Sequence, residues 1–180
     1  MHARFQSKRK VRFYAMAKIA VIMGSDSDVA TMKGCIEQLS HFGLQARVRI
    51  LSAHRSPAAV EEFAASAAAN GVAVIIAAAG MSAALAGTIA ARTTMPVIGV
   101  AIPSGPLNGV DALLSIVQMP PGVPVACAGI GSAGAVNAAV LAAQMLALSD
   151  PALQAKLKAY KEELERKTLE KDRKCQQEFV

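Results

Sequence analysis

The sequence contains no tryptophan, and aromatic residues make up only 4% of its 180 residues. This scarcity argues against a protein that binds single-stranded nucleic acid by stacking bases on aromatic side chains. The chain is nevertheless 53% hydrophobic, and 37 of its residues are alanine. It therefore has enough apolar surface to form a core. A chain of this length is expected to form one domain.

Charged residues are also scarce in the central part of the chain. Residues 19–150 hold five basic and seven acidic side chains, which is 12 charges in 132 residues, whereas charged residues make up about a quarter of an ordinary domain. The net charge of +6 comes from six basic residues among the first 18, because the charges of the other 162 residues cancel. The body therefore lacks the basic stripe of a DNA-binding domain. We expect a homo-oligomer that buries much of this uncharged surface.

The cysteine pattern predicts neither disulfides nor a metal site. Cys35, Cys127 and Cys175 are widely spaced and odd in number, which favours free thiols in a reducing cytoplasm. No apolar run free of charges and turn breakers reaches the roughly 18 residues of a membrane span. The basic N-terminal stretch is not followed by the apolar segment of a secretory signal. We therefore expect a cytoplasmic protein with no membrane partner.

Strand and helix patterns alternate along the chain. Continuous apolar runs predict five buried strands, and the segments between them have helical spacing. Short connections between strands and helices predict a parallel sheet with helices on both faces. We expect a three-layer, doubly wound, flavodoxin-like α/β fold with strand order 2-1-3-4-5. The predicted strands are 19–23, 47–51, 72–78, 97–101 and 124–128, and the predicted helices are 27–42, 57–70, 82–93, 109–117 and 132–148.

The two ends of the chain differ from the single α/β domain that we predict for residues 18–150. Residues 150–174 are rich in charge, with apolar residues at spacings of mostly three to five. This pattern predicts an amphipathic C-terminal helix, and we expect residues 151–180 to pack on a neighbouring subunit. Residues 1–17 are predicted to be a disordered basic extension. Met16 is an alternative start of the native chain, and a basic targeting arm is an alternative function for the extension.

The segment after the first strand combines glycine, hydroxyl and carboxylate groups. It reads Gly24-Ser25-Asp26-Ser27-Asp28. A glycine turn followed by hydroxyls at a helix start is suited to a phosphate group. A simple helix cap made by Ser25 or Asp26 explains the same residues equally well. Asp28 is too acidic for phosphate and is better suited to ribose hydroxyls.

The segment after the second strand contains a histidine beside a cation. It reads Ser52-Ala53-His54-Arg55-Ser56-Pro57. Ser52 and Arg55 are suited to binding phosphate together. Histidine side chains can give and take a proton near neutral pH, and His54 follows a strand where ligands bind in such sheets, so we predict that it transfers a proton. The structural alternative is a helix cap at Ser56 with His54 and Arg55 merely solvated.

The segment after the third strand is small and apolar. Residues 77–87 include Ala79, Gly80, Ser82 and Leu85, which leave room for a flat ring, although close packing of helix on sheet explains them too. Metal-ligand, Walker and dinucleotide motifs are absent from the sequence. Together the three segments predict a ribonucleotide monophosphate as ligand and a proton transfer as chemistry, with no metal or cofactor.

These motifs resemble the aminoimidazole ribonucleotide carboxylase family of purine biosynthesis. The resemblance rests on Gly24–Asp28 and Ser52–Pro57, continues through Ser115–Pro120 and Asn137–Ala139, and covers about residues 18–150. It implies a cofactor-free enzyme that assembles as an octamer. In the mutase form of the family, a carboxyl group moves from the exocyclic nitrogen to C4 of the imidazole ribotide. An ATP-dependent synthetase that carboxylates the nitrogen is the functional partner that this reaction implies.

The resemblance also implies roles for individual residues. His54 matches the proton-transfer residue, Asp28 matches the ribose contact, and the phosphate contacts match Ser25, Ser52 and Arg55. Ala79 and Gly80 match backbone positions around the base and its carboxylate, and we add Ser82 and Leu85 to that pocket. Residues 115–120 match a loop near the site.

The chain departs from the family pattern after the third strand. The mutase form has a stretch of the type Gly-Gly-Ala-Ala-His-Leu-Pro-Gly, whereas residues 80–87 read Gly-Met-Ser-Ala-Ala-Leu-Ala-Gly. Ala84 thus replaces the histidine, and Ala86 replaces the proline. Arg55 and the Gln118-Met119-Pro120 run still fit the mutase form. Direct carboxylation of aminoimidazole ribotide by CO2 is the alternative reaction, and a non-catalytic nucleotide-binding module is a second alternative.

Overall fold

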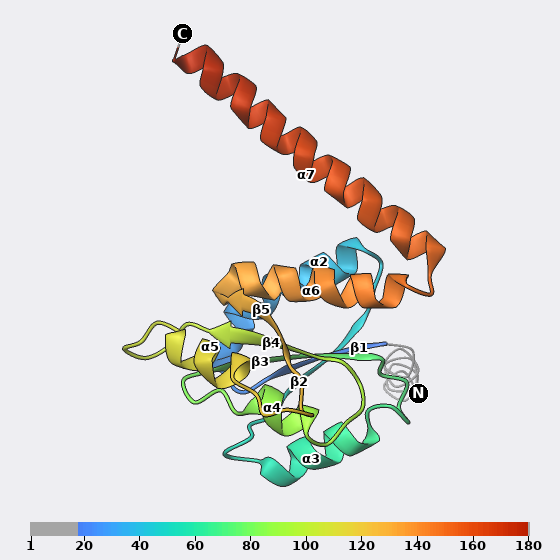
Figure 1. Cartoon of the computed structure of the whole chain (residues 1–180), viewed down its shortest axis with the longest axis vertical. Helices are drawn as coiled ribbons and strands as arrows, with labels where there is room; N and C mark the ends of the chain where they lie inside the picture. Colours follow the sequence, from blue (N-terminus) through green and yellow to red (C-terminus); the bar gives the residue numbers. More distant parts are fainter. Residues whose placement is uncertain (1–17, 180) are drawn as a thin grey trace, which may run out of the picture.

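The structure is a computed structural model, in which residues 18–179 are described. Its fold is a five-stranded parallel sheet between two layers of helices (Figure 1). The strand order is β2-β1-β3-β4-β5, and every neighbouring pair is parallel. This confirms the predicted fold class and strand order. The predictions for residues 1–17 lie outside the described residues. The strands are β1 (Ile19–Met23), β2 (Ala46–Ile50), β3 (Val74–Gly80), β4 (Val97–Ile102) and β5 (Ala126–Ile130).

The helices cover both faces of the sheet. The helical elements are η1 (Asp26–Asp28), α2 (Val29–His41), α3 (Pro57–Ser66), α4 (Leu85–Ala90), α5 (Val110–Val117), α6 (Gly131–Ala147) and α7 (Pro151–Glu178). Helices α2 and α6 lie on one face, and α3, α4 and α5 lie on the other (Figure 1). The two faces therefore have separate hydrophobic cores.

Strand β1 shows why the central strands are apolar throughout. All five of its residues are buried. Ala20 and Ile22 pack in the core with α3, α4 and α5, whereas Ile19, Val21 and Met23 pack in the core with α2 and α6. Alternate side chains of a strand point to opposite faces of its sheet, so a strand covered on both faces needs a continuous apolar run.

Several element boundaries differ from the predictions. Strand β3 extends to Gly80, which pairs with Ile102 at the end of β4, and β5 begins two residues later than expected. Helix α4 spans only Leu85–Ala90, so the predicted helix over 82–93 was too long. Interstrand pairing decides where a strand ends, and the apolar pattern does not contain that information.

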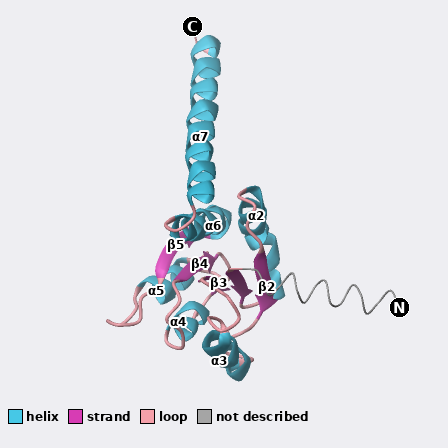
Figure 2. Cartoon of the chain, turned by 90° about the vertical axis from the view of Figure 1, so that its right-hand side faces the viewer, coloured by secondary structure: helices cyan, strands magenta, loops and turns pink. Residues whose placement is uncertain are grey.

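The C-terminal helix α7 begins on the body and then leaves it. The Asp150 side chain accepts a hydrogen bond from the Leu153 backbone N–H at 3.0 Å, and Leu153 is buried beside Phe42 and α6. The Tyr160 ring meets the Phe42 ring edge-on, with 5.3 Å between centroids. Beyond this contact α7 extends away from the sheet (Figures 1 and 2). The predicted helix is confirmed, and its packing on a neighbouring subunit stays a prediction.

The thiols of the described chain are all free. Cys35 is buried, Cys127 is half-buried, and Cys175 is exposed on α7. Burial raises the pKa of the Cys35 thiol to about 12, so it stays protonated inside the core. None of the helices within residues 18–179 combines the length and the hydropathy that crossing a membrane requires.

Candidate active site

A cleft opens at the carboxyl ends of β1, β2 and β3, beside the point where the strand order reverses. Its volume is about 500 Å³. The Gly24 backbone N–H donates to the Ala78 carbonyl at 2.9 Å, and the Leu51 N–H donates to the Met23 carbonyl at 2.9 Å. These bonds hold the three following segments side by side, which is where ligands bind in doubly wound sheets. All nine residues predicted for the site line this cleft: Ser25, Asp28, Ser52, His54, Arg55, Ala79, Gly80, Ser82 and Leu85.

The segment after β1 folds as a capping box. The Ser25 side chain accepts a hydrogen bond from the Ser27 backbone N–H at 3.3 Å, and the Asp28 carboxylate accepts one from the Ser25 N–H at 3.0 Å. This arrangement satisfies backbone donors at the start of η1. The structural role of Ser25 is thus present, and the same residue also lines the cleft. The cap and the predicted ligand contact are compatible.

Asp28 is the buried acid of the site. Only 4% of the residue is exposed. Burial raises the pKa of its carboxyl group, and the hydrogen bond from the Ser25 N–H opposes that rise. The second carboxylate oxygen has a longer contact of 3.4 Å with the Ser27 hydroxyl. One oxygen is therefore used for structure, and the other has only this longer contact.

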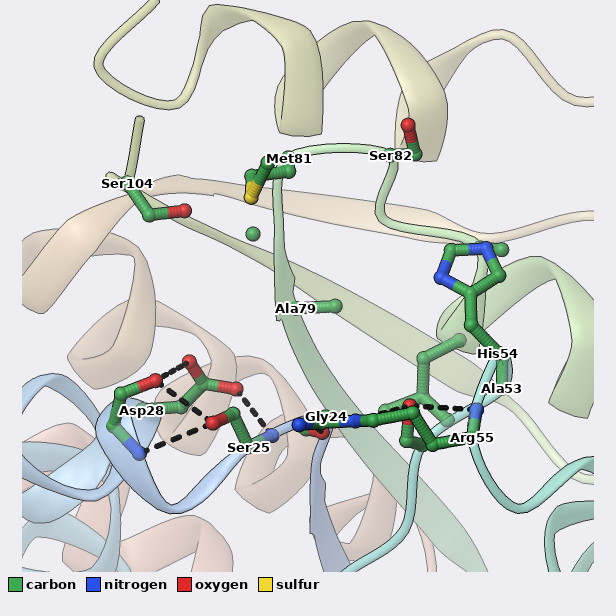
Figure 3. A pocket seen from close by; sticks show the side chains of 15 residues that line it. Gly24, Ser25, Asp28, Ala53, His54, Arg55, Ala79, Met81, Ser82 and Ser104 are labelled. Carbon is green, nitrogen blue, oxygen red and sulfur yellow. Dashed lines mark hydrogen bonds between the residues drawn. The ribbon is translucent and has the colours of Figure 1, made fainter. Parts of the chain in front are cut away.

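Arg55 ties the segments after β1 and β2 together. Its Nη2 donates to the Gly24 carbonyl at 2.9 Å, and its Nε donates to the Ser52 hydroxyl at 3.3 Å. The Ser56 hydroxyl does not cap α3 as the alternative interpretation proposed, because it donates to the Ser52 carbonyl at 3.1 Å. The guanidinium lies beside the Ser25 segment in Figure 3. A fixed cation beside serine hydroxyls is an arrangement suited to a phosphate group.

His54 lies on the same turn but faces another part of the cleft. The side chain is exposed and makes no hydrogen bond to another residue of the described chain. In Figure 3 the imidazole stands across Ala79 from Asp28. Since neither ring nitrogen is engaged by a protein group, both are available to a ligand. A group that accepts and returns protons needs this freedom.

The wall between Asp28 and His54 comes from the end of β3. Ala79 is 9% exposed, and Leu85 is 2% exposed. Ser82 does not cap the following helix, although serine is a preferred cap residue: the cap residue of α4 is Ala84, and no side chain caps it. A tight turn intervenes, in which the Ala83 N–H donates to the Met81 carbonyl at 2.8 Å. Ser82 is exposed and lines the cleft.

Six lining residues were not among the predicted site residues. They are Gly24, Ser27, Ala53, Met81, Ala84 and Ser104. Five of them lie in the three segments that follow β1, β2 and β3, where the sequence predicts the site but does not show which side chains point into the cleft. Ser104 follows the end of β4. Its position after the fourth strand is the signal that could have predicted it, because ligands bind at the carboxyl ends of the strands in such sheets. Residues 115–120 do not line the cleft of this subunit, and Met119 instead packs against Gly87 of α4.

The fold and the cleft together define a doubly wound α/β protein with a site suited to a small phosphorylated ligand. The AIR carboxylase family model matches residues 18–167. The chain belongs to that family.

Named relatives support this assignment. The chain is 50% identical over 151 residues to the N5-carboxyaminoimidazole ribonucleotide mutase of Pyrococcus abyssi, covering 84% of this chain and 86% of the relative. It is 46% identical to the mutase of Thermotoga maritima, covering 90% and 94%. Among solved structures, Treponema denticola PurE matches with a TM-score of 0.78 at 30% identity, covering 87% of this chain and 96% of that one.

Proposed function

We propose that this chain catalyses the N5-carboxyaminoimidazole ribonucleotide mutase reaction of purine biosynthesis. The observation that carries the proposal is the grouping of Arg55, Asp28 and His54 on one cleft, in a chain half identical to relatives named for this reaction. The enzyme moves a carboxyl group within one molecule. Residues 18–150 form the catalytic domain in this proposal.

The phosphate of the ribotide binds between the segments after β1 and β2. Arg55 supplies the positive charge there, and the hydroxyls of Ser25 and Ser52 supply hydrogen bonds. Arg55 already donates hydrogen bonds to the Ser52 hydroxyl and to the carbonyl of Gly24, the residue before Ser25. A site that is ordered before the ligand arrives loses little side-chain entropy on binding. Asp28 then accepts hydrogen bonds from the ribose hydroxyls through the oxygen that Ser25 does not use.

The chemistry needs one proton that is given and taken back. His54 in its protonated form donates to the exocyclic nitrogen as the N–C bond of the carbamate breaks, which yields CO2 and the free amine. Ring C4 then attacks the CO2, and neutral His54 removes the C4 proton. The proton given to nitrogen is recovered from carbon, so the cycle balances with one histidine. This scheme accommodates Ala84 in place of the second histidine of the family.

The wall of the cleft suits the reacting end of the substrate. Ala79, Gly80 and Leu85 present backbone and small apolar groups, which allow the flat imidazole to approach closely, and Ser82 borders the carboxylate. An apolar environment also limits the access of water to the carboxylated intermediates.

The test is conversion of N5-carboxyaminoimidazole ribonucleotide to its ring-carboxylated isomer, followed by mass spectrometry and ultraviolet absorbance. We expect acceleration over the spontaneous background. His54→Asn should lower kcat by about 10²- to 10⁴-fold, as expected for loss of a general acid and base. His41→Asn is the matched control, because His41 lies at the end of α2 beside Tyr160 and outside the cleft. No acceleration by the unaltered protein would refute the proposal.

Direct carboxylation of aminoimidazole ribotide by CO2 is the second candidate. Ala84 favours it, because this half-buried cleft residue has no proton-transferring group where the mutase motif has histidine. Turnover of unsubstituted ribotide with bicarbonate at low concentration would support this candidate. Dependence on the N-carboxylated substrate would exclude it.

The proposal extends to the assembly and the surroundings of the enzyme. We propose a cytoplasmic homo-octamer whose substrate comes from an ATP-dependent synthetase, with no nucleic-acid or membrane partner. The exposed apolar residues Leu107, Val110, Leu114 and Val117 on and before α5 support burial between subunits. Light scattering coupled to size-exclusion chromatography measures the assembly directly. A monomer at micromolar concentration would contradict it.

A further inference from the structure

Met81 has an unusual backbone conformation directly at the cleft. Its φ is 54°, in the left-handed region, and among the described non-glycine residues only Asn108 shares this property. Asparagine is enriched in that region, whereas an unbranched apolar residue is not. Met81 occupies the position of the second glycine in the mutase-type stretch. Glycine adopts a left-handed conformation without a steric cost, whereas methionine does not.

The side chain of Met81 is equally unusual in its exposure. It is 58% exposed although it is large and apolar, and it lines the cleft. Figure 3 shows it above Ala79, between Ser104 and Ser82. Gly105 lies close by, so that a β-carbon on that glycine would be 3.8 Å from the Met81 Cγ. The thioether therefore lies where the base and carboxylate of the substrate are placed in the proposed function.

A strained backbone and an exposed apolar side chain both disfavour this residue in the free protein. Strained conformations persist mostly where a site uses them. A bound imidazole ring would cover the thioether, and methionine sulfur makes favourable contacts with aromatic rings. The flexible side chain can also fill an irregular gap.

We propose that Met81 closes the carboxylate end of the cleft over the bound ring and retains the CO2 released there. This inference rests on the proposed function. Carbamate cleavage leaves a small neutral molecule that must stay beside C4 until the new C–C bond forms. An apolar cap retains it and excludes water without adding a group that competes for the proton. Met81 is thus a residue that determines whether the carboxyl group is transferred within the site or exchanged with solvent.

The experiment measures retention of the carboxyl carbon. Substrate labelled with ¹³C in its carboxyl group is converted in unlabelled bicarbonate with carbonic anhydrase, so that escaped CO2 is diluted at once. We expect the unaltered enzyme to retain most of the label in the product, after correction for the enzyme-free reaction. Met81→Gly and Met81→Ala should lose at least half of it and release aminoimidazole ribotide. Met81→Leu, which keeps the apolar bulk, should retain it.

Two controls separate the cap from other effects. Asn108→Gly relieves backbone strain of the same kind at a residue that does not line the cleft, and it should retain label like the unaltered enzyme. Met81→Ala removes the side chain but keeps a non-glycine residue in the left-handed conformation. Loss of label in both Met81→Gly and Met81→Ala would therefore assign the effect to the side chain. Full retention in an active Met81→Gly or Met81→Ala enzyme would overturn this inference alone. Absence of conversion by the unaltered enzyme would overturn the proposed function and this inference with it.

Discussion

The Asp28 carboxylate accepts a hydrogen bond from the Ser25 backbone N–H at 3.0 Å, so one acid both caps the first turn and faces the cleft. Only 4% of Asp28 is exposed. A carboxyl group buried to this extent costs stability when it ionises, which is typical of a residue held for binding.

Asp28→Asn should stabilise the fold at neutral pH while weakening ribotide binding. Burial raises the pKa of Asp28 above its ordinary value of 3.8. As pH rises through 3.8 and above, the unfolded chain ionises first, and the folded state loses stability relative to it. Asparagine keeps an acceptor for the Ser25 N–H and never ionises. Urea unfolding at pH 4 and pH 7 should show a larger advantage of the variant at pH 7.

Asp26→Asn provides a control of opposite sign. The Ser25 hydroxyl holds the pKa of the exposed Asp26 carboxyl below its ordinary value. That group stabilises the fold at neutral pH, and the contribution is lost as pH falls below 3.8, so the stability that this variant loses at pH 7 should shrink at pH values below 3.8. The same pH trend in both variants would contradict the assignment of the Asp28 shift to burial.

Arg55→Lys should raise the KM for ribotide about 10- to 100-fold. Lysine keeps the charge but cannot donate to the Gly24 carbonyl and the Ser52 hydroxyl at once. The expected loss corresponds to one hydrogen bond from a charged group, at about 1.5–3 kcal/mol. Steady-state kinetics measures the change. Arg92→Lys is the control, because Arg92 does not line the cleft. Its Nη2 lies 3.1 Å from the Glu61 carboxylate in an exposed ion pair. Equal KM values for Arg55→Lys and the unaltered enzyme would contradict this role.

Gly80→Ala should destabilise the fold by about 1–3 kcal/mol, the usual cost of overpacking. A methyl group on Gly80 would overlap the Ser104 hydroxyl and lie 3.1 Å from the Ile102 carbonyl oxygen. Adding Ser104→Ala should recover part of the loss, because the hydroxyl is removed and the carbonyl remains. Urea unfolding of both single variants and the double variant measures the coupling. Gly24→Ala should change little, since a methyl group there meets nothing closer than 3.5 Å.

Leu164→Glu combined with Leu169→Glu should reduce the assembly to smaller species. These side chains are 40% and 49% exposed on the part of α7 that extends from the body. If α7 packs on a neighbouring subunit, buried carboxylates there would strongly oppose association. Light scattering measures the mass. Gln177→Glu on the same helix should leave it unchanged, and an intact assembly in the double variant would show that this part of α7 is not an interface.

Much of the site was predictable because parallel strands have a simple geometry. The segments after the first three strands were expected to converge, and Arg55 does link Ser52 to Gly24. The length of α4 was not predictable in the same way. Alanine-rich sequence from 82 to 93 favours helix throughout, yet the turn at Met81 and the pairing of Gly80 with Ile102 move the helix start to Leu85. Local propensity cannot report a constraint that comes from a neighbouring strand.

The layers, the strand order and the chemical groups of the cleft could be predicted from the amino-acid sequence, because burial on both faces of a strand and the direction of parallel strands follow from the apolar pattern and the connections. How those groups are used follows from the folded contacts. One oxygen of Asp28 accepts from the Ser25 backbone, neither nitrogen of His54 has a partner within residues 18–179, and Met81 adopts a left-handed conformation beside Ser104. These outcomes depend on contacts between segments far apart in the chain, and no local pattern encodes them.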